Sequence, residues 1–390
     1  MAAPTKIPTL IVGGGIGGLA TALALARHRR PAHVLEKAME FGEIGAGLQL
    51  APNAVRVLDQ LGVLPELNKL AVHPSRLVWM DAVSEQKITE LDLGDTFKRA
   101  FGHPYMVMHR SDLLEVLLNA CRAEKLITLE PGRAVQRVED LGDSAQAFCA
   151  DGSRYEAEVL VGADGLRSAV RVLIVDDQPI ADGYVAYRGT IPMDKISKHA
   201  GHDNVVMWAG PDMHFVQYPV RRGELYNQVA VFRSKRYRPG TEDWGTPDEL
   251  DAHYAQAGEY VRNSLKLMFR DRRWAMYDRL PIDRWSRNRI VLMGDAAHPM
   301  YQYIAQGACQ AIEDSLCLAK SLAASPDPVA GIAAYETARK LRTARVQITA
   351  RAMGRFFHLD GVAATMRNAL MAQRAATDYS MINWLYGHKV

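Results

Sequence analysis

The stretch Thr9–Ala26, TLIVGGGIGGLATALALA, decides how the rest of the chain is interpreted. The chain carries no charge from Ile7 to Ala26, and about 20 apolar residues could span a bilayer or form the core of a signal peptide. Five glycines between positions 13 and 18 argue against both, because each glycine inside a helix costs roughly 1 kcal/mol relative to alanine. The apolar residues also change from a strand-like run to a helical repeat. The stretch therefore predicts a strand, a tight turn and a helix.

The glycines of this turn have the spacing G-x-G-x-x-G, which is typical of dinucleotide binding between a strand and a helix. The first glycine allows the turn, the second lets a pyrophosphate approach, and the third lets the helix pack on the strand. The helix N-terminus offers N–H groups and partial positive charge to the phosphates. A second strand, HVLEK, places an acidic residue about 20 residues further on, where it accepts ribose hydroxyls. The residues expected to contact the nucleotide are Gly13, Gly15, Ile16, Gly18, Glu36 and Lys37.

Length, composition and net charge limit the kinds of protein that this chain can be. A chain of 390 residues with 48% hydrophobic and 23% charged residues is typical of a globular protein of about two domains. The net charge of +3 is too small to favour nucleic acid as a partner. The four cysteines form no CxxC pair and no metal-binding spacing. We therefore expect reduced thiols, a cytoplasmic location, no metal, no nucleic acid and no transmembrane segment.

The order of strand-like and helical segments predicts a discontinuous α/β nucleotide-binding domain. We expect antiparallel strands within residues 76–104, Ser111 as the N-cap of an amphipathic helix, and a buried strand at Val159–Ala163. The arginine-rich segment RKLRTARVQITAR is interpreted as a solvated helix face. The expected division is residues 1–75, 105–178 and 280–350 for the nucleotide domain, 76–104 and 179–279 for an inserted sheet-rich substrate domain, and 351–390 for a helical C-terminal segment.

Two later motifs place polar groups at the ends of buried strands. VGADG carries Asp164 and Gly165, and VLMGDAAHP carries Asp295 and Pro299 before a helix whose first turn holds Gly307 and Ala308. Ligands of open α/β sheets lie beyond the carboxyl ends of the strands. A carboxylate there can accept from ribitol hydroxyls, and a helix N-terminus can stabilise a reduced isoalloxazine. Because only one G-x-G-x-x-G is present, FAD is favoured over a separately bound NAD.

The three motifs in this order resemble the single-component FAD-dependent aromatic hydroxylases, the para-hydroxybenzoate hydroxylase-like group. The resemblance covers nearly the whole chain. It implies a Rossmann-like FAD-binding domain of that type, an inserted β-sheet substrate domain, a helical C-terminus, NADH as a visiting co-substrate, and a homodimer. It also implies that Arg110 faces the FAD, that Gly47 and Gln49 lie beside the flavin, and that the backbone of Val135 meets the adenine.

A narrower set of segments, including EFGEIGAGLQL, YVAYRGT, MHFVQYP, GDAAHPMYQYIAQGA and FHLDG, resembles the 3-hydroxybenzoate 6-hydroxylases within that group. This resemblance implies NADH- and O2-dependent para-hydroxylation of 3-hydroxybenzoate to 2,5-dihydroxybenzoate (gentisate) through a flavin C4a-hydroperoxide. It also implies a substrate pocket lined by Tyr105, His214, Tyr218 and Gln302, with the last three in catalytic roles.

The residues themselves leave alternatives open. His214 and Tyr218 alternate onto one strand face, and a histidine is suited to take the proton of a phenol near neutral pH. Both, like Gln302, could instead be ordinary core or surface residues, and Arg188 could reach either the cofactor or a carboxylate. His298 is expected to be structural. Salicylate and 6-hydroxynicotinate hydroxylases share the scaffold, and a non-hydroxylating FAD redox protein would keep the nucleotide motifs without the activity.

Overall fold

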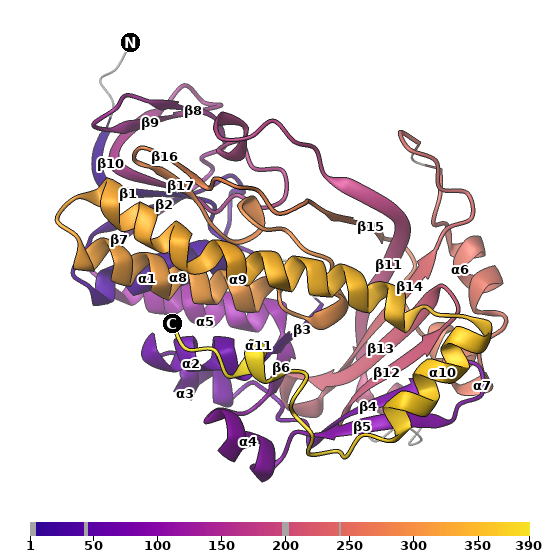
Figure 1. Cartoon of the computed structure of the whole chain (residues 1–390). Helices are drawn as coiled ribbons and strands as arrows, with labels where there is room; N and C mark the ends of the chain where they lie inside the picture. The colour runs from indigo at the N-terminus through magenta and orange to yellow at the C-terminus, as the bar shows by residue number, and fades with distance from the viewer. Residues whose placement is uncertain (1–4, 43–45, 197–202, 242) are drawn as a thin grey trace.

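The computed structural model describes residues 5–42, 46–196, 203–241 and 243–390, so Glu43–Gly45 of the segment EFGEIGAGLQL lie outside the described residues. Two large sheets form the molecule: one of eight strands, which carries the glycine-rich turn, and one of seven strands. The long helix α9, Pro328–Phe357, runs alongside both (Figure 1). The fold is the α/β arrangement, with a helical C-terminus, that the motifs predict.

The eight-stranded sheet, here called the nucleotide sheet, has the strand order β16-β17-β10-β1-β2-β7, with β9 paired to β10 and β8 paired to β9. Its central pairs β17–β10, β10–β1, β1–β2 and β2–β7 are parallel. Such strands are buried on both faces and form near-continuous hydrophobic runs. The bounds are β1 Thr5–Val12, β2 Ala32–Glu36, β7 Ile127–Pro131, β8 Val135–Asp140, β9 Ala145–Cys149, β10 Arg154–Gly162, β16 Ser286–Arg287 and β17 Ile290–Leu292.

The register of this sheet aligns three strand ends that are far apart in the sequence. Val12 pairs with Gly162, and Gly162 pairs with Leu292. Helices α1, Ile16–Arg27, and α8, Gly307–Ala324, begin beyond this edge and pack against each other. The three motifs therefore meet at one edge, as the sequence predicts.

The seven-stranded sheet, here called the substrate sheet, has the order β15-β11-β14-β13-β12-β4-β5. All its pairs are antiparallel except β12–β4. Helices α6 and α7 cover one face through an aromatic core that includes Phe215 and Tyr254. The bounds are β4 Arg76–Asp81, β5 Lys87–Asp92, β11 Ile180–Pro192, β12 Val205–Gly210, β13 Met213–Val220, β14 Leu225–Arg233, β15 Arg273–Asp278, α6 Pro247–Tyr254 and α7 Glu259–Leu265.

Helix α9 connects the two sheets. Near its start, Tyr335 Oη donates to the carbonyl of Leu292 in β17 over 3.3 Å. Near its end, Arg351 binds both carboxylate oxygens of Asp278 in β15 over 2.6 Å. The remaining elements are β3 Gly47–Leu50, α2 Pro52–Gln60, α3 Leu64–Asn68, α4 Asp95–Phe101, β6 Met106–His109, α5 Arg110–Ala123, α10 Gly361–Ala372 and α11 Asn383–Tyr386.

Two local expectations are wrong. Helix α5 begins at Arg110 with His109 as its N-cap, and the Ser111 hydroxyl bonds His109 Nδ1 over 2.6 Å instead of capping the helix. The arginine-rich stretch of α9 is not simply a solvated face, because Arg339 is only 1% exposed. Its guanidinium binds the buried carboxylates of Glu313 and Asp314, which sequence spacing alone does not reveal.

Within the described ranges, every helix is too short or too polar to cross a bilayer. The same residues contain no group of three or more His, Cys, Asp or Glu side chains arranged to hold a metal ion.

Candidate active site

The glycine-rich turn is shaped by close backbone contacts. Gly13 has a positive φ of 111° and donates its N–H to the carbonyl of Leu35 over 2.8 Å. A Cβ on Gly13 would overlap the Ala163 carbonyl of the second motif, and a Cβ on Gly18 would overlap the Gly13 carbonyl. Both positions therefore require glycine, and the turn brings α1 close to the strand end.

The side chain of Glu36 contacts the backbone of the glycine-rich turn. One oxygen of its carboxylate accepts from Gly14 N over 2.8 Å and the other from Ala38 N over 2.9 Å. Each oxygen keeps a further acceptor site, as ribose recognition requires. The Glu36 carbonyl accepts from Arg133 N over 2.8 Å, which brings the start of β8 and Val135 close to the turn. Lys37 is exposed beside it.

The two aspartates of the later motifs differ in their surroundings. Asp164 bonds within its own loop, accepting from Ser168 Oγ over 2.5 Å and from Ala169 N over 2.7 Å, and Gly165 follows with a positive φ of 78°. The Asp295 side chain is exposed, yet burial raises its pKa, against the opposing effects of His298 and Arg110. A carboxylate that solvent reaches but surrounding protein desolvates fits a ligand-facing wall better than open surface.

Residues around Asp295 complete this wall. A Cβ on Gly307 would lie 3.9 Å from Asp295 Oδ1, so the first turn of α8, with Ala308, lies directly beside the carboxylate. Burial lowers the pKa of Arg110 at the start of α5, and Asp295 opposes that shift. The Pro299 carbonyl accepts from the side chain of Gln347 in α9 over 3.0 Å, which fixes the loop between the motif and α8.

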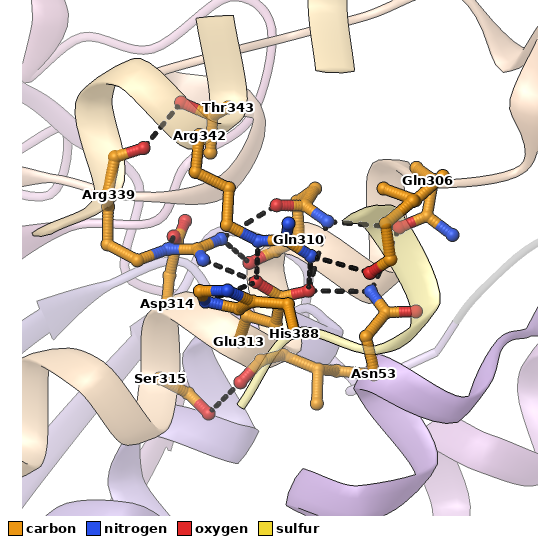
Figure 2. A network of polar contacts seen from close by, with 12 residues as sticks. Asn53, Gln306, Gln310, Glu313, Asp314, Ser315, Arg339, Arg342, Thr343 and His388 are labelled. Atoms are coloured by element: carbon orange, nitrogen blue, oxygen red, sulfur yellow. Dashed lines mark hydrogen bonds and ion pairs between the residues drawn. The ribbon is translucent and has the colours of Figure 1, made fainter. Parts of the chain in front are cut away.

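A buried polar network supports the first turn of α8 from behind (Figure 2). Asn53 Nδ2 donates to Gln306 Oε1 over 3.0 Å and to Glu313 Oε1 over 2.6 Å. Arg339 binds Glu313 and also Asp314, the latter over 2.7 Å from its Nε. All five side chains are at most 1% exposed. The network therefore fixes α8 relative to α2 and α9 inside a region of low dielectric constant.

The same network holds the C-terminal tail. Arg342 binds Glu313 over 2.6 Å and donates to the carbonyls of Trp384 and Leu385 over 3.2 and 2.9 Å. The ring of Tyr386 then lies 6.0 Å from the ring of Tyr105, which donates to Gln49 Oε1 over 2.6 Å. The tail thus packs behind Tyr105 and Gln49, two residues that the sequence resemblance places at the site.

The loop at Gly47 touches the substrate sheet directly. Gly47 N donates to Asn227 Oδ1 over 2.6 Å, and a Cβ on Gly47 would lie 2.6 Å from both Asn227 Cγ and Tyr218 Cε2. The two sheets are therefore in contact beside Gln49, without room for a side chain on residue 47.

Gly47→Ala is expected to push Tyr218 and Asn227 away from the loop. Overpacking of a tight contact costs about 1–3 kcal/mol, so Tm should fall by several degrees and the KM for the aromatic acid should rise. Thermal unfolding and steady-state kinetics measure both, and Gly42→Ala, where the added Cβ meets nothing within 4 Å, is the matched control. If Gly47→Ala and Gly42→Ala had the same Tm and the same KM, the tight contact of Gly47 with Tyr218 and Asn227 would be contradicted.

One face of the substrate sheet carries the predicted pocket residues. Along β13, His214, Val216 and Tyr218 alternate with residues of the opposite face, and the register places Arg188 of β11 in the same row as Val216. Burial lowers the pKa of His214 to about 3 and raises that of Tyr218. His214 is therefore neutral at physiological pH. Its Nδ1 lies 2.8 Å from Nε2 of His358, and its Nε2 has no hydrogen-bond partner among the described residues.

Gln302 lies close to this face because the next residue, Tyr303, packs beside His214. It begins the short turn η5, Gln302–Ile304, and the ring of Tyr303 lies 5.5 Å from the ring of His214. The Gln302 side chain is half-buried and makes no hydrogen bond to a described residue. His298 points elsewhere: its Nε2 bonds Asp314 over 2.5 Å, the structural role expected for it.

Two further residues of this region have no sequence signature that predicts a role for them. His358 lies in the quoted segment FHLDG, but a histidine pair formed across 144 residues has no local signature. Asn227 anchors Gly47 from the middle of an ordinary-looking strand, NQVAVFR. Arg188, for which the sequence leaves two roles open, is half-buried, and its Nε has no hydrogen-bond partner among the described residues.

These residues fit FAD. The turn at Gly13 and Gly18 excludes side chains where a pyrophosphate approaches, and Asp295 faces outward beside the N-terminus of α8. The Nε2 atom of Gln306, directly before α8, is buried without a partner among the described residues. A buried polar atom of this kind is expected to meet a further polar group.

The sequence comparisons agree with this geometry. A family model described as an FAD binding domain matches residues 6–351. The chain is 41% identical to 3-hydroxybenzoate 6-hydroxylase 1 of Aquipseudomonas alcaligenes over 97% of both chains. It is 39% identical to 3-hydroxybenzoate 6-hydroxylase of Klebsiella oxytoca over 97% of this chain and 96% of that protein.

Among solved structures, the fold matches HpxO of Klebsiella pneumoniae complexed with FAD and uric acid. The TM-score is 0.84 at 24% identity, and the match covers 97% of this chain and 95% of that one. With its FAD-binding motifs joined at one sheet edge and full-length similarity to flavin hydroxylases, the chain belongs to the FAD-dependent aromatic hydroxylases, a family of monooxygenases.

Proposed function

We propose that this enzyme hydroxylates 3-hydroxybenzoate para to its hydroxyl group, using NADH and O2 and releasing 2,5-dihydroxybenzoate. The observation that carries the proposal is His214, a buried and neutral histidine with an unpartnered Nε2, on the face of the substrate sheet that approaches the flavin-side loop. The near full-length similarity to 3-hydroxybenzoate 6-hydroxylases supports the same substrate.

In this proposal, FAD is held by the residues of the nucleotide sheet edge. The backbone of Gly13, Gly15, Ile16 and Gly18 cradles the diphosphate, and Glu36 and Lys37 meet the ribose side. Val135 contacts the adenine through its backbone. Around the flavin and ribityl chain lie the remaining cofactor residues, Gly47, Gln49, Arg110, Asp164, Gly165, Asp295, Pro299, Gly307 and Ala308. When bound and reduced by NADH, FAD would activate O2 as an electrophilic donor of one oxygen atom, the other leaving as water.

The chain's own residues prepare the ring for that oxygen. His214 Nε2 accepts the phenol proton, which makes the ring electron-rich at the position para to the oxygen. Tyr218, Tyr105 and Gln302 hold the ring by contact and hydrogen bonding. The aromatic and aliphatic side chains around His214 exclude water, which would otherwise release the oxygen as peroxide.

We assign the carboxylate of the substrate to Arg188. Its guanidinium is desolvated, it forms no ion pair with a described carboxylate, and burial lowers its pKa while Tyr218 opposes that shift. Truncating one partner of a buried charge pair costs about 2–5 kcal/mol. Arg188→Leu should therefore raise the KM for 3-hydroxybenzoate at least about 30-fold, measured by initial rates. Loss of flavin instead, with KM unchanged in the reconstituted enzyme, would assign Arg188 to the cofactor.

One experiment separates this function from its alternatives. The yellow protein is mixed with NADH and with 3-hydroxybenzoate, salicylate or 6-hydroxynicotinate in turn, and products are identified by mass and retention time. We expect substrate-stimulated NADH oxidation and 2,5-dihydroxybenzoate with 3-hydroxybenzoate alone. Peroxide as the only product with that acid would refute the assignment, and tight flavin without stimulated oxidation would indicate a redox protein.

We propose, further, that the enzyme is a cytoplasmic homodimer. Its four cysteines are free and buried, as expected in a reducing compartment. Val362, Met366 and Leu370 form an exposed apolar stripe along α10, of the kind that subunit interfaces cover. Light scattering on the flavin-bound protein tests this, and a monomer at micromolar concentration would contradict it. The division into residues 1–75, 105–178 and 280–350, residues 76–104 and 179–279, and residues 351–390 remains our proposal for the domains.

A further inference from the structure

The histidine pair behind the proposed substrate face is isolated from carboxylates. His214 lies in β13 and His358 is the residue that follows the last turn of α9, and the exposed fractions are 3% and 6%. Their rings stack at 5.1 Å with an interplanar angle of 22°. No described carboxylate forms an ion pair or hydrogen bond with either ring. The partner that orients the proposed base is therefore another imidazole, not an aspartate.

Aromatic groups surround the pair. The Tyr184 ring stacks on His358 at 4.6 Å, and the Tyr303 ring lies 5.5 Å from each imidazole. Tyr184 Oη donates to Asp212 Oδ1 over 2.7 Å, away from the histidines. Burial lowers the pKa of His358, and the charges of the neighbouring groups lower it further. The titratable and charged groups that face the pair are Tyr184, Asp212, His253, Tyr303 and Arg367.

A hydrogen bond between two neutral imidazoles contains one proton. If His214 Nδ1–H donates to His358 Nε2, then His214 Nε2 is unprotonated and can act as a base. In the opposite arrangement His214 Nε2 carries the proton and cannot accept another. Only the first arrangement leaves His214 Nε2 able to accept a proton, so it is the productive one for a phenol.

We propose that His358 is a positioning residue that completes proton removal from the substrate by taking the second proton of His214. This inference rests on the proposed function. When the phenol O–H bond breaks, its electron pair stays on oxygen and the proton binds His214 Nε2. The N–H bond at His214 Nδ1 breaks in turn, and that proton binds His358 Nε2. His214 ends neutral, as the other tautomer, and the positive charge resides on His358.

The second ring nitrogen of His358, Nδ1, is the atom from which the proton can leave the pair. Nδ1 of His358 is buried but has no hydrogen-bond partner among the described residues. Buried polar atoms without a protein partner commonly bond to ordered water. Without His358, a protonated His214 would have no hydrogen-bond acceptor for its Nδ1–H, and an unpaired charge in this apolar enclosure is disfavoured.

The test uses His358→Gln, which keeps an amide close to the former Nε2 and can hydrogen-bond His214 but cannot take up a proton. The readout is the ultraviolet difference spectrum of 3-hydroxybenzoate bound to the flavin-containing enzyme, which reports its phenolate, as a function of pH. We expect the midpoint of phenolate formation to rise by at least about one pH unit, a tenfold change in equilibrium, with flavin content and Tm unchanged. His253→Asn is the control, because His253 faces the pair without bonding it, and its midpoint should remain that of the wild type.

An unchanged midpoint in His358→Gln, or an equal shift in His253→Asn, would overturn the proposal. A second readout does not depend on the substrate. In the ligand-free enzyme labelled with [15N]histidine, we expect His214 Nε2 to resonate as an unprotonated nitrogen with Nδ1 protonated, and a protonated Nε2 would overturn the arrangement. If 3-hydroxybenzoate fails to bind the wild type while the nitrogen signals are as expected, the proposed substrate fails and the histidine pair stands.

Discussion

His214→Asn is expected to lower the rate of hydroxylation by about 10²- to 10⁴-fold while leaving FAD bound, because general-base catalysis contributes that much. Asparagine keeps an amide near the former Nδ1, so its contact with His358 at 2.8 Å can survive. Only the base at Nε2 is removed. NADH oxidation should continue, and its reducing equivalents should appear as hydrogen peroxide instead of 2,5-dihydroxybenzoate.

Product yield per NADH, measured by chromatography together with a peroxide assay, gives the result directly. Tyr218→Phe is the companion variant on the same strand face, and we expect a smaller loss of hydroxylation with flavin retained. A wild-type yield from His214→Asn would exclude His214 as the base. Loss of flavin in both variants would mean that this face is structural and not catalytic.

Arg339→Met is expected to destabilise the folded enzyme by about 3–5 kcal/mol, because it removes the guanidinium that binds both buried carboxylates, Glu313 and Asp314. Burial alone would raise the pKa of Glu313, but Arg339 and Arg342 outweigh it and lower that pKa to about 2. A carboxylate with a depressed pKa contributes stability above its unfolded pKa of 4.5 and loses it as the pH falls towards 2. The free energy of unfolding of Arg339→Met should therefore fall less than that of the wild type when the pH is lowered.

Urea unfolding of the flavin-bound protein at pH 7 and at pH 4 measures both effects. Arg355→Met is the matched control, because Arg355 is an exposed arginine of the same helix. We expect a change within about 0.5 kcal/mol for this surface substitution. Indistinguishable midpoints for the two variants would show that the buried network does not stabilise the fold. Flavin should also be released more readily from Arg339→Met, since the network supports the first turn of α8.

The sequence predicted those parts of the site that depend on local rules. The glycine turn, the two strands that end in aspartate motifs and their meeting at one edge all follow from short motifs and from the geometry of parallel sheets, and the register from Val12 to Gly162 to Leu292 confirms them. The alternation of His214 and Tyr218 onto one face of β13 also agrees with the strand.

The rest depends on contacts that no local pattern contains. Helix α6 was missed inside a strand-rich region, although Thr246 and Glu249 form a capping box that could have indicated its start. The start of α5 was misplaced by two residues, because Ser111 bonds the side chain of His109 instead of a backbone N–H. The pairs Arg339–Glu313 and His214–His358 join distant segments, so only the folded chain reveals them.

The register of the nucleotide sheet also constrains synthesis of the protein. Strand β1 emerges from the ribosome well before its neighbour β10, which ends at Gly162, and before β17, which begins at Ile290. The C-terminal segment that contacts the buried polar network, including His388, follows later still. The edge of the nucleotide sheet is therefore incomplete until β17 has been synthesised, and we expect FAD to bind only after that point.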